Sequence, residues 1–333
     1  MQIFVFGMHR SGTSMVTRVL NLMGAYIGAE GCALGANPEN PKGFWERQDV
    51  HDANAALLAA AGCSWDRPLG FAEAAIPQQD LAAFEKCARS IVLNIDAHRP
   101  WVIKDPRLCL TFPYWRPLLE VPVCVHVVRS PVEVAASLST RNSIPIPVGL
   151  ELWECYIRSA LEATRGLPHV VVSHRQLIED PCVAVADLVN RLRRHCQKTL
   201  RKPSDQEIEA FVSNELYRHR DSAVNAEPYR NATQLAFYER LISRSLPEAR
   251  DVPPTYEHLA AYQRSAASRT PTVAGGNNEA LAAGGSVPDR QVTEAEALRA
   301  ELQQRGDAVS RLEGQVEELR REATRCREAL QAA

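Results

Sequence analysis

The stretch FVFGMHRSGTSMV, Phe4 to Val16, joins an apolar run to a polar loop with two glycines and two hydroxyl residues. The run predicts a buried strand, and the residues from Thr13 onward predict a helix that Thr13 caps. A strand that turns sharply into a helix points backbone N–H groups and the positive end of the helix dipole at one place, a geometry that binds phosphate. The stretch therefore predicts an α/β fold that starts with an anion-binding loop. The alternative is a glycine-rich turn without a ligand.

The loop is close to the Walker pattern G-x-x-x-x-G-K-[ST] but departs from it at one position. Thr13 stands where that pattern has the lysine that reaches the β- and γ-phosphates, and the cation of this loop is Arg10. We expect Arg10, Ser11, Gly12, Thr13 and Ser14 to hold an anionic group other than a nucleoside triphosphate. His9, in the same loop, either contacts the transferred group or the substrate, or only packs there.

Apolar runs alternate with helical stretches up to about residue 260. A nearly continuous apolar run such as VPVCVHVV, residues 121–128, indicates a strand covered on both faces, as in a parallel sheet. In this strand His126 is expected to be a buried histidine with satisfied hydrogen bonds. Ser204 and Glu207 predict a capping box. The fold class is therefore α/β, with a P-loop-like parallel sheet flanked by helices. We expect strands at 2–6, 101–104, 122–128 and 169–173, and helices at 13–23, 46–61, 78–97, 131–140, 148–165, 181–196, 205–216 and 231–244.

The C-terminal part of the chain differs in composition. Residues 261–291 are small, polar and rich in glycine, which is typical of a flexible linker between the α/β domain at 1–260 and the last segment. Residues 292–333 carry apolar side chains at alternating steps of four and three, which predicts a C-terminal coiled-coil helix that oligomerises or docks on a partner. The alternatives are a solvated single helix and a disordered tail.

The bulk properties exclude several classes. The 333 residues carry a formal net charge of −2, which argues against general attraction to nucleic acid. The nine cysteines include no CxxC pair, so we expect reduced thiols and a cytoplasmic protein. No apolar run reaches the length of a membrane span, and the first strand leaves no room for a signal peptide.

A second motif follows the strand at 122–128. Arg129 stands at the carboxyl end of that strand, where parallel sheets present ligand contacts, and Pro131 begins a helix that contains Ser137. An arginine at such a position taken alone is usually a surface residue. Its occurrence together with the first loop points to a shared ligand.

These two motifs resemble those of the sulfotransferases that use 3′-phosphoadenosine 5′-phosphosulfate (PAPS). The resemblance covers about residues 1–245 and includes SHRQLIEDP, Ser173 to Pro181. It implies that the loop from Arg10 to Ser14 binds the 5′-phosphosulfate and that Arg129 and Ser137 bind the 3′-phosphate. Many members have lysine where this chain has Arg10, and the glycine- and lysine-rich motif of the cytosolic small-molecule enzymes is not found here.

The resemblance also implies candidates for the chemistry. Glu46 corresponds to the glutamate that serves as base in the glycan-modifying branch, although it can also be a purely structural carboxylate. Lys104 ends the strand expected at 101–104, Asp105 follows it, and Pro106 occupies the place of the histidine base of the cytosolic branch. Lys104 could contact the sulfuryl oxygens and Arg107 could bind an acidic or sugar substrate, or these charges could form a salt-bridged strand end.

The tryptophans Trp45 and Trp65 are candidates for stacking on a sugar, whereas Trp101 is expected in the core. The leading hypothesis is sulfuryl transfer from PAPS to a hydroxyl of a carbohydrate, glycolipid or small metabolite, without a metal. A P-loop small-molecule or nucleoside kinase and a non-catalytic nucleotide-binding scaffold are the alternatives.

Overall fold

The computed structural model describes residues 1–29, 45–195, 200–212, 232–243, 254 and 256–267. The chain divides into two compact units, Met1–Pro271 and Thr272–Ala333. The second unit lies outside the described residues, and so does the coiled coil predicted at 292–333.

Four parallel strands form the sheet, in the order β2-β1-β3-β4. Ile3 of β1 pairs with Val102 of β2 on one side and with Val123 of β3 on the other. The carboxyl ends of all four strands therefore meet at one edge of the sheet. The strands are β1 (Gln2–Phe6), β2 (Trp101–Lys104), β3 (Pro122–Val128) and β4 (His169–Ser173).

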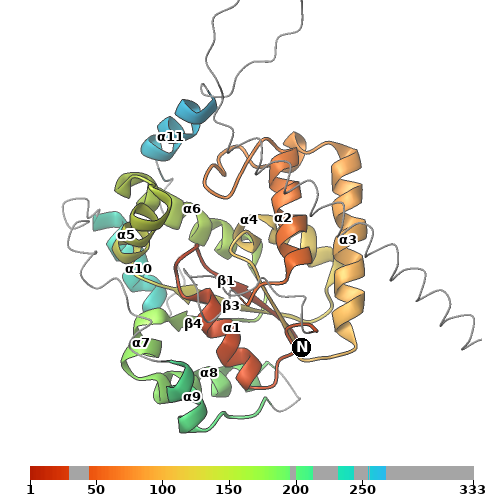
Figure 1. Ribbon diagram of the computed structural model, residues 1–333, viewed down its shortest axis with the longest axis vertical. Coiled ribbons are helices and arrows are strands. Elements are labelled where there is room, and N and C mark those ends of the chain that lie inside the picture. The colour runs from red at the N-terminus through yellow and green to blue at the C-terminus, as the bar shows by residue number, and fades with distance from the viewer. Residues whose placement is uncertain (30–44, 196–199, 213–231, 244–253, 255, 268–333) are drawn as a thin grey trace, which may run out of the picture. The chain divides into compact units, whose positions relative to one another are not determined.

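Helices cover the sheet on both faces (Figure 1). The α-helices are α1 (Thr13–Leu22), α2 (Gln48–Ala60), α3 (Gln78–Asp96), α4 (Leu108–Trp115), α5 (Pro131–Asn142), α6 (Ile146–Ala163), α7 (His174–Glu179), α8 (Pro181–Arg193), α9 (Asp205–Phe211), α10 (Ala232–Ile242) and α11 (Glu257–Ala267). Two short 3-10 helices are η1 (Glu73–Ala75) and η2 (Arg116–Leu118).

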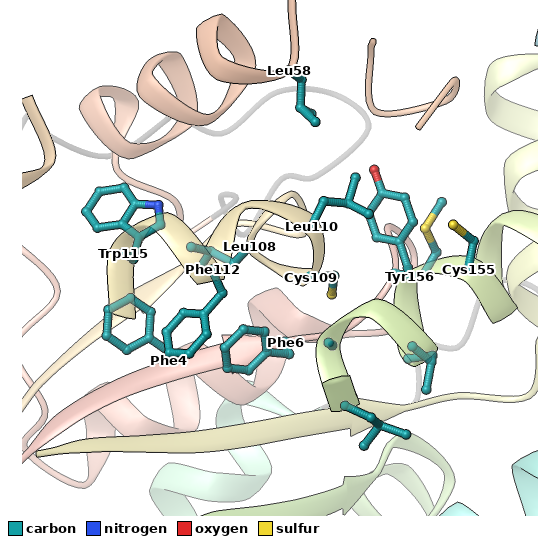
Figure 2. Packing of buried hydrophobic residues seen from close by; sticks show 14 of the residues in the cluster. Phe4, Phe6, Leu58, Leu108, Cys109, Leu110, Phe112, Trp115, Cys155 and Tyr156 are labelled. Atoms are coloured by element: carbon teal, nitrogen blue, oxygen red, sulfur yellow. The ribbon is translucent and has the colours of Figure 1, made fainter. Parts of the chain in front are cut away.

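Successive residues of β1 point to opposite faces and belong to two separate cores. Phe4 and Phe6 pack with α2, α3, α4 and α6, and Figure 2 shows them beside Phe112 of α4. Ile3 and Val5 pack with α1, α7, α8 and α9. All seven residues of β3 are buried, which confirms a strand covered on both faces.

The expected strands agree with the structure at every boundary, and the α/β class with a parallel sheet is confirmed. The capping box of Ser204 and Glu207 is present at α9. The expected core position of Trp101 is also confirmed, since this side chain is fully buried.

Several expectations differ from the structure in detail. Thr13 is the first helical residue of α1, and Gly12 is its N-cap, because the tight turn needs the left-handed backbone of a glycine. The helices α4, α7 and α11 are not among the expected helices. The first residues of the segment predicted as a linker, 261–267, belong to α11, and the rest of that segment lies outside the described residues.

His126 only partly meets the expectation of a satisfied core histidine. Its Nε2 lies 3.2 Å from Thr164 Oγ1, whereas Nδ1 has no hydrogen-bond partner among the described residues. Burial lowers the pKa of His126 to about 3, so the side chain is neutral at physiological pH.

Candidate functional site

The first loop, Gly7 to Gly12, connects β1 to α1 at the carboxyl edge of the sheet. Gly12 has φ 87°, and α1 begins without a side-chain cap and without an acidic residue in its first turn. The N–H groups that start α1 therefore have no side-chain partner at the cap, and the dipole of the helix is not offset by a carboxylate. The hydroxyl of Ser11 is fully buried and lacks a hydrogen-bond partner within the described part of the chain. These features fit an anion held by the loop.

The first loop and the second motif meet in space although they are far apart in sequence. Arg10 Nε donates to Ser137 Oγ at 3.0 Å across a separation of 127 residues. Arg129 donates through a guanidinium nitrogen to the backbone oxygen of Arg10 at 2.9 Å. The two arginine side chains, Arg10 and Arg129, thus lie close together in the fold and are linked by hydrogen bonds through Ser137 and the Arg10 backbone.

Neighbouring elements hold Arg129 in place. Its Nε donates to Glu133 Oε2 of α5 at 2.8 Å, and its backbone oxygen accepts from Trp153 Nε1 of α6 at 3.1 Å. Because Arg129 is largely buried, these partners fix the direction of the guanidinium before any ligand arrives.

His174, the first residue of α7, packs against Gly12 of the loop. A Cβ added at Gly12 would lie 2.3 Å from His174 Cδ2, so the imidazole occupies the space that a side chain at position 12 would need. Burial, and secondly the charge of Arg129, lowers the pKa of His174 to about 3. A neutral ring therefore packs against the turn at Gly12.

Lys104, the last residue of β2, contacts both the start of α1 and Glu46. Its Nζ donates to Ser14 Oγ of α1 at 3.1 Å and forms an ion pair with Glu46. The Lys104 side chain is 1% exposed and that of Glu46 is 10% exposed. An ammonium group is thus buried at the start of α1, beside the loop and opposite a carboxylate.

Asp105 organises the turn after β2 and is fully buried. Its Oδ1 accepts from the backbone N–H of Arg107 at 2.8 Å and from the guanidinium of Arg107 at 3.2 Å. Its Oδ2 accepts from Asn54 of α2 at 3.3 Å. Both carboxylate oxygens therefore have partners, and Asp105 sets the position of Arg107.

His9 lies on the other side of the loop, in an aromatic setting. Its ring centroid is 4.5 Å from that of Trp65 and 6.1 Å from that of Tyr156 in α6. The hydroxyl of Tyr156 donates to the backbone oxygen of Trp65 at 2.6 Å, which links this wall together. The Nε2 atom of His9 is buried and has no hydrogen-bond partner among the described residues.

The pKa of His9 is lowered well below its usual value of 6.5. Burial is the largest cause, followed by the charges of Arg107, Lys104, Arg10 and His51. All of these disfavour the imidazolium form, so His9 is neutral at physiological pH in the ligand-free protein.

Trp45, a candidate for stacking on a sugar, lies beside α1. Trp45 has Arg18 of α1 over its ring, with Cζ 4.7 Å from the centroid, so its face is already covered on that side. The sequence motifs gave no role to Asn54, Tyr156 or His174, and only the position of His174 inside the SHRQLIEDP segment could have drawn attention to it.

No group of three or more His, Cys, Asp or Glu residues that could hold a metal ion occurs in the described ranges. None of the described helices is both long and apolar enough to cross a membrane.

The chain was also compared with known proteins. No protein-family model matches it, and a search of curated proteins found no match. Among solved structures, the sulfotransferase domain of the olefin synthase from Synechococcus PCC 7002 is 15% identical, covering 80% of this chain and 94% of that one with a TM-score of 0.39.

Two further solved structures are similar to the chain at the same level. The sulfotransferase STF9 from Mycobacterium avium is 13% identical, with 73% of this chain and 76% of that one covered and a TM-score of 0.41. A retinol dehydratase in complex with androsterone and the inactive cofactor PAP is 14% identical, with 77% and 83% covered and a TM-score of 0.36.

Proposed function

We propose that this protein is a sulfotransferase that moves a sulfuryl group from PAPS to an acceptor hydroxyl. The observation that carries the proposal is the hydrogen bond between Arg10 and Ser137, together with the bond from Arg129 to the Arg10 backbone. Two motifs that resemble the 5′-phosphosulfate and 3′-phosphate sites of one family thereby lie side by side, as a single ligand with both groups requires.

The residues of the site suit a donor that carries two separate anionic groups, a 5′-phosphosulfate and a 3′-phosphate. The N–H groups at the start of α1, the hydroxyl of Ser11 and Arg10 would hold the 5′-phosphosulfate, with Thr13 and Ser14 at the helix start. Arg129 and Ser137 would hold the 3′-phosphate. Arginine supplies a permanent, forked cation for this purpose, so Arg10 can take the part that lysine has in many related loops.

Transfer requires charge stabilisation more than covalent help from the protein. The acceptor oxygen bonds to sulfur, and the bond from sulfur to the bridging oxygen of the phosphate breaks with its electron pair leaving on that oxygen. Arg10 would stabilise the charge that develops on the leaving phosphate. The buried ammonium of Lys104 is a second cation for the transferred group, and it lies beside Ser14.

Glu46 has two roles open to it in this scheme. The resemblance implies that it is the base, and the ion pair with Lys104 gives it the function of orienting that ammonium. Asp105 has the narrower role of positioning Arg107, which we propose as a substrate-binding residue.

The main alternative is a P-loop kinase. That function predicts a lysine directly after Gly12, where this chain has Thr13. The buried cation near the helix start is instead Lys104, which comes from β2. A nucleotide-binding scaffold without turnover is the other alternative, and it predicts that loss of Glu46 or Asp105 has no effect on function.

Binding of 3′,5′-adenosine bisphosphate tests the donor site directly. Calorimetric titration should show binding that needs no metal, and Arg129→Ala should weaken it at least tenfold, since a charge-assisted bond is lost. Arg89→Ala is the matched control, because Arg89 is exposed on α3 and pairs with Glu85. Binding of ATP only with magnesium, without binding of the bisphosphate, would move the kinase to first place.

Two further expectations accompany the proposal. The acceptor hydroxyl belongs to a carbohydrate, a glycolipid or a small metabolite, and the protein acts in the cytoplasm. The segment 292–333 forms a coiled coil that mediates self-association or docking on a partner. Light scattering of the full chain beside a variant that ends at residue 271 measures whether this segment changes the oligomeric state.

A further inference from the structure

His9 stands out among the polar groups of the site because its Nε2 atom is buried without a hydrogen-bond partner among the described residues. A buried polar atom without a partner costs free energy, so it needs a reason such as a ligand. The ring lies next to Arg10 in sequence and against Trp65 and Tyr156 in space. His9 therefore lies where the first loop meets an aromatic wall.

The other side chains nearby that could accept a proton already take part in ion pairs or hydrogen bonds. Glu46 forms the ion pair with Lys104, and Asp105 accepts hydrogen bonds at both oxygens from Arg107 and Asn54. His51 of α2 lies 2.9 Å from Asp52 through its Nδ1. His9 Nε2 takes part in no hydrogen bond among the described residues, so an acceptor hydroxyl can engage it without breaking an existing contact.

We propose that His9 Nε2 receives the hydrogen bond of the acceptor hydroxyl and, as sulfur is transferred, its proton, while Trp65 lines the acceptor beside it. This inference rests on the proposed sulfotransferase function. The proton leaves the acceptor oxygen as that oxygen bonds to sulfur, and the product is an imidazolium at His9, a sulfate ester and 3′,5′-adenosine bisphosphate. The step requires the tautomer with the hydrogen on Nδ1.

The charges around His9 link proton acceptance to donor binding. The charges that lower the pKa of His9 come from Arg10 of the loop, Lys104 at the end of β2, Arg107 of the turn after β2 and His51 of α2, and the ring of Tyr156 lies near from α6. A bound phosphosulfate would offset the charges of Arg10 and Lys104, which raises the pKa of His9 toward its ordinary value. The base then becomes effective only when the donor is present, which limits proton uptake from water.

The wall also indicates a class of acceptor. Trp65 is partly exposed and presents aromatic surface beside the nitrogen that would bind the hydroxyl, whereas the neighbouring ring of Tyr156 is fully buried. A hydroxyl on a ring with a flat face, as in an aryl alcohol or a pyranose, can stack there while it donates to Nε2. 2-Naphthol and methyl β-glucopyranoside are suitable probes of this class.

The test compares His9→Asn with Glu46→Gln in the full chain. Calorimetry with 3′,5′-adenosine bisphosphate comes first, and its binding should change less than about threefold in His9→Asn, since the donor residues remain. Turnover of PAPS is then measured with water, 2-naphthol and methyl β-glucopyranoside. We expect His9→Asn to lower kcat about 10²–10⁴-fold, the usual contribution of general base catalysis, and to remove the acidic limb of the pH profile.

A measurement on the wild-type protein covers the case in which the variant does not fold. Nuclear magnetic resonance of ¹⁵N-histidine-labelled protein follows the titration of His9, and the bisphosphate should raise its pKa. An unchanged pKa of His9 with bound bisphosphate would overturn the proposal, and so would an active His9→Asn with an unaltered pH profile beside an inactive Glu46→Gln. If the wild type does not bind the bisphosphate, the proposed function itself fails, which is a different result.

Discussion

Arg10 has left-handed backbone at φ 70°, a conformation that residues other than glycine rarely adopt. Strain of this kind occurs at functional sites when the surrounding contacts hold it. Here the backbone oxygen of Arg10 accepts from Arg129 and its side chain donates to Ser137. These contacts hold the left-handed backbone of Arg10 in place. They also fix the direction of its guanidinium, so the cation is oriented by the fold itself.

Gly12→Ala should disrupt donor binding more than it disrupts folding. The new Cβ would lie 2.3 Å from His174 Cδ2, so either the loop or the imidazole must move. The alanine backbone would also have to adopt φ 87°, which is unfavourable for residues other than glycine. We expect 3′,5′-adenosine bisphosphate to bind at least tenfold more weakly by calorimetry.

Gly24→Ala is the matched control for this substitution. Gly24 has φ 99° and nothing lies within 4 Å of its added Cβ, so it reports the backbone cost alone, about 1–2 kcal/mol of stability. If both variants lose the same stability and both keep full affinity for the bisphosphate, the contact between Gly12 and His174 has no part in the site.

The residues proposed to bind the anion could be singled out in the sequence because they occur in short local motifs. The residues around them could not. Trp65, Tyr156 and Asn54 lie in segments without a recognisable pattern, and they reach the site only because α2 and α6 pack over the sheet. Burial and partners, which decide the roles of His9 and Glu46, are tertiary properties and leave no local signal.

At the scale of elements, α11 holds the segment that carries Trp65. The side-chain amide of Gln263 accepts from the Leu69 N–H at 3.1 Å and donates to the Leu69 oxygen at 2.8 Å. Both backbone polar groups of Leu69 are thus bonded to one side chain, as they would be to a neighbouring strand. Tyr262 donates to Asp66 at 3.2 Å. Glu151 of α6 accepts from the backbone N–H of Leu259 at 2.7 Å and thereby fixes the start of α11.

Gln263→Ala should loosen the segment around Trp65 while the donor site stays intact. Two hydrogen bonds are lost and the backbone of Leu69 is left to water, which removes about 1–3 kcal/mol of local stability. Hydrogen exchange should become faster at Leu69 and its neighbours, and the Michaelis constant for 2-naphthol should rise, with unchanged affinity for 3′,5′-adenosine bisphosphate. The exposed neighbour Arg264 gives the control variant Arg264→Ala. Equal exchange in both variants would show that α11 does not secure this segment.

The elements themselves were largely predictable, and the exceptions have physical reasons. Buried parallel strands are apolar throughout and amphipathic helices repeat every 3.6 residues, so both give strong local patterns. The helix α4 contains Pro113 and follows Pro106, which suggests a break in the chain. It forms because its apolar residues, including Phe112 and Trp115, are buried against β1 and α3, as Figure 2 shows in part.

At the scale of the whole molecule, stability should decrease in mild acid. Burial lowers the pKa of His126 and of His174 to about 3, from an ordinary value of 6.5. The unfolded chain therefore binds more protons than the folded one below pH 6.5. The stability that these groups contribute is complete above about pH 6.5 and is lost as the pH falls toward 3, by at most about 1.4 kcal/mol per pH unit for each group.

Urea unfolding between pH 8 and pH 5 measures this loss. His126→Gln should reduce the slope of stability against pH by about one proton, whereas His98→Gln, at an exposed position, serves as the control. A second decline is expected below pH 4, because Arg99 lowers the pKa of Asp96 from 3.8 to about 2. Stability that stays constant from pH 8 to pH 5 would contradict the neutral, buried state of these histidines.

During synthesis on the ribosome, the first loop emerges long before the residue that completes it. Ser137 follows Arg10 by 127 residues, which at 5–20 residues per second corresponds to roughly 6–25 s. In that interval the loop has its glycines and its cation, but neither the hydroxyl of Ser137 nor the guanidinium of Arg129. The proposed site is therefore incomplete in a nascent chain until β3 and α5 have joined the sheet, more than a hundred residues after the loop itself has been made.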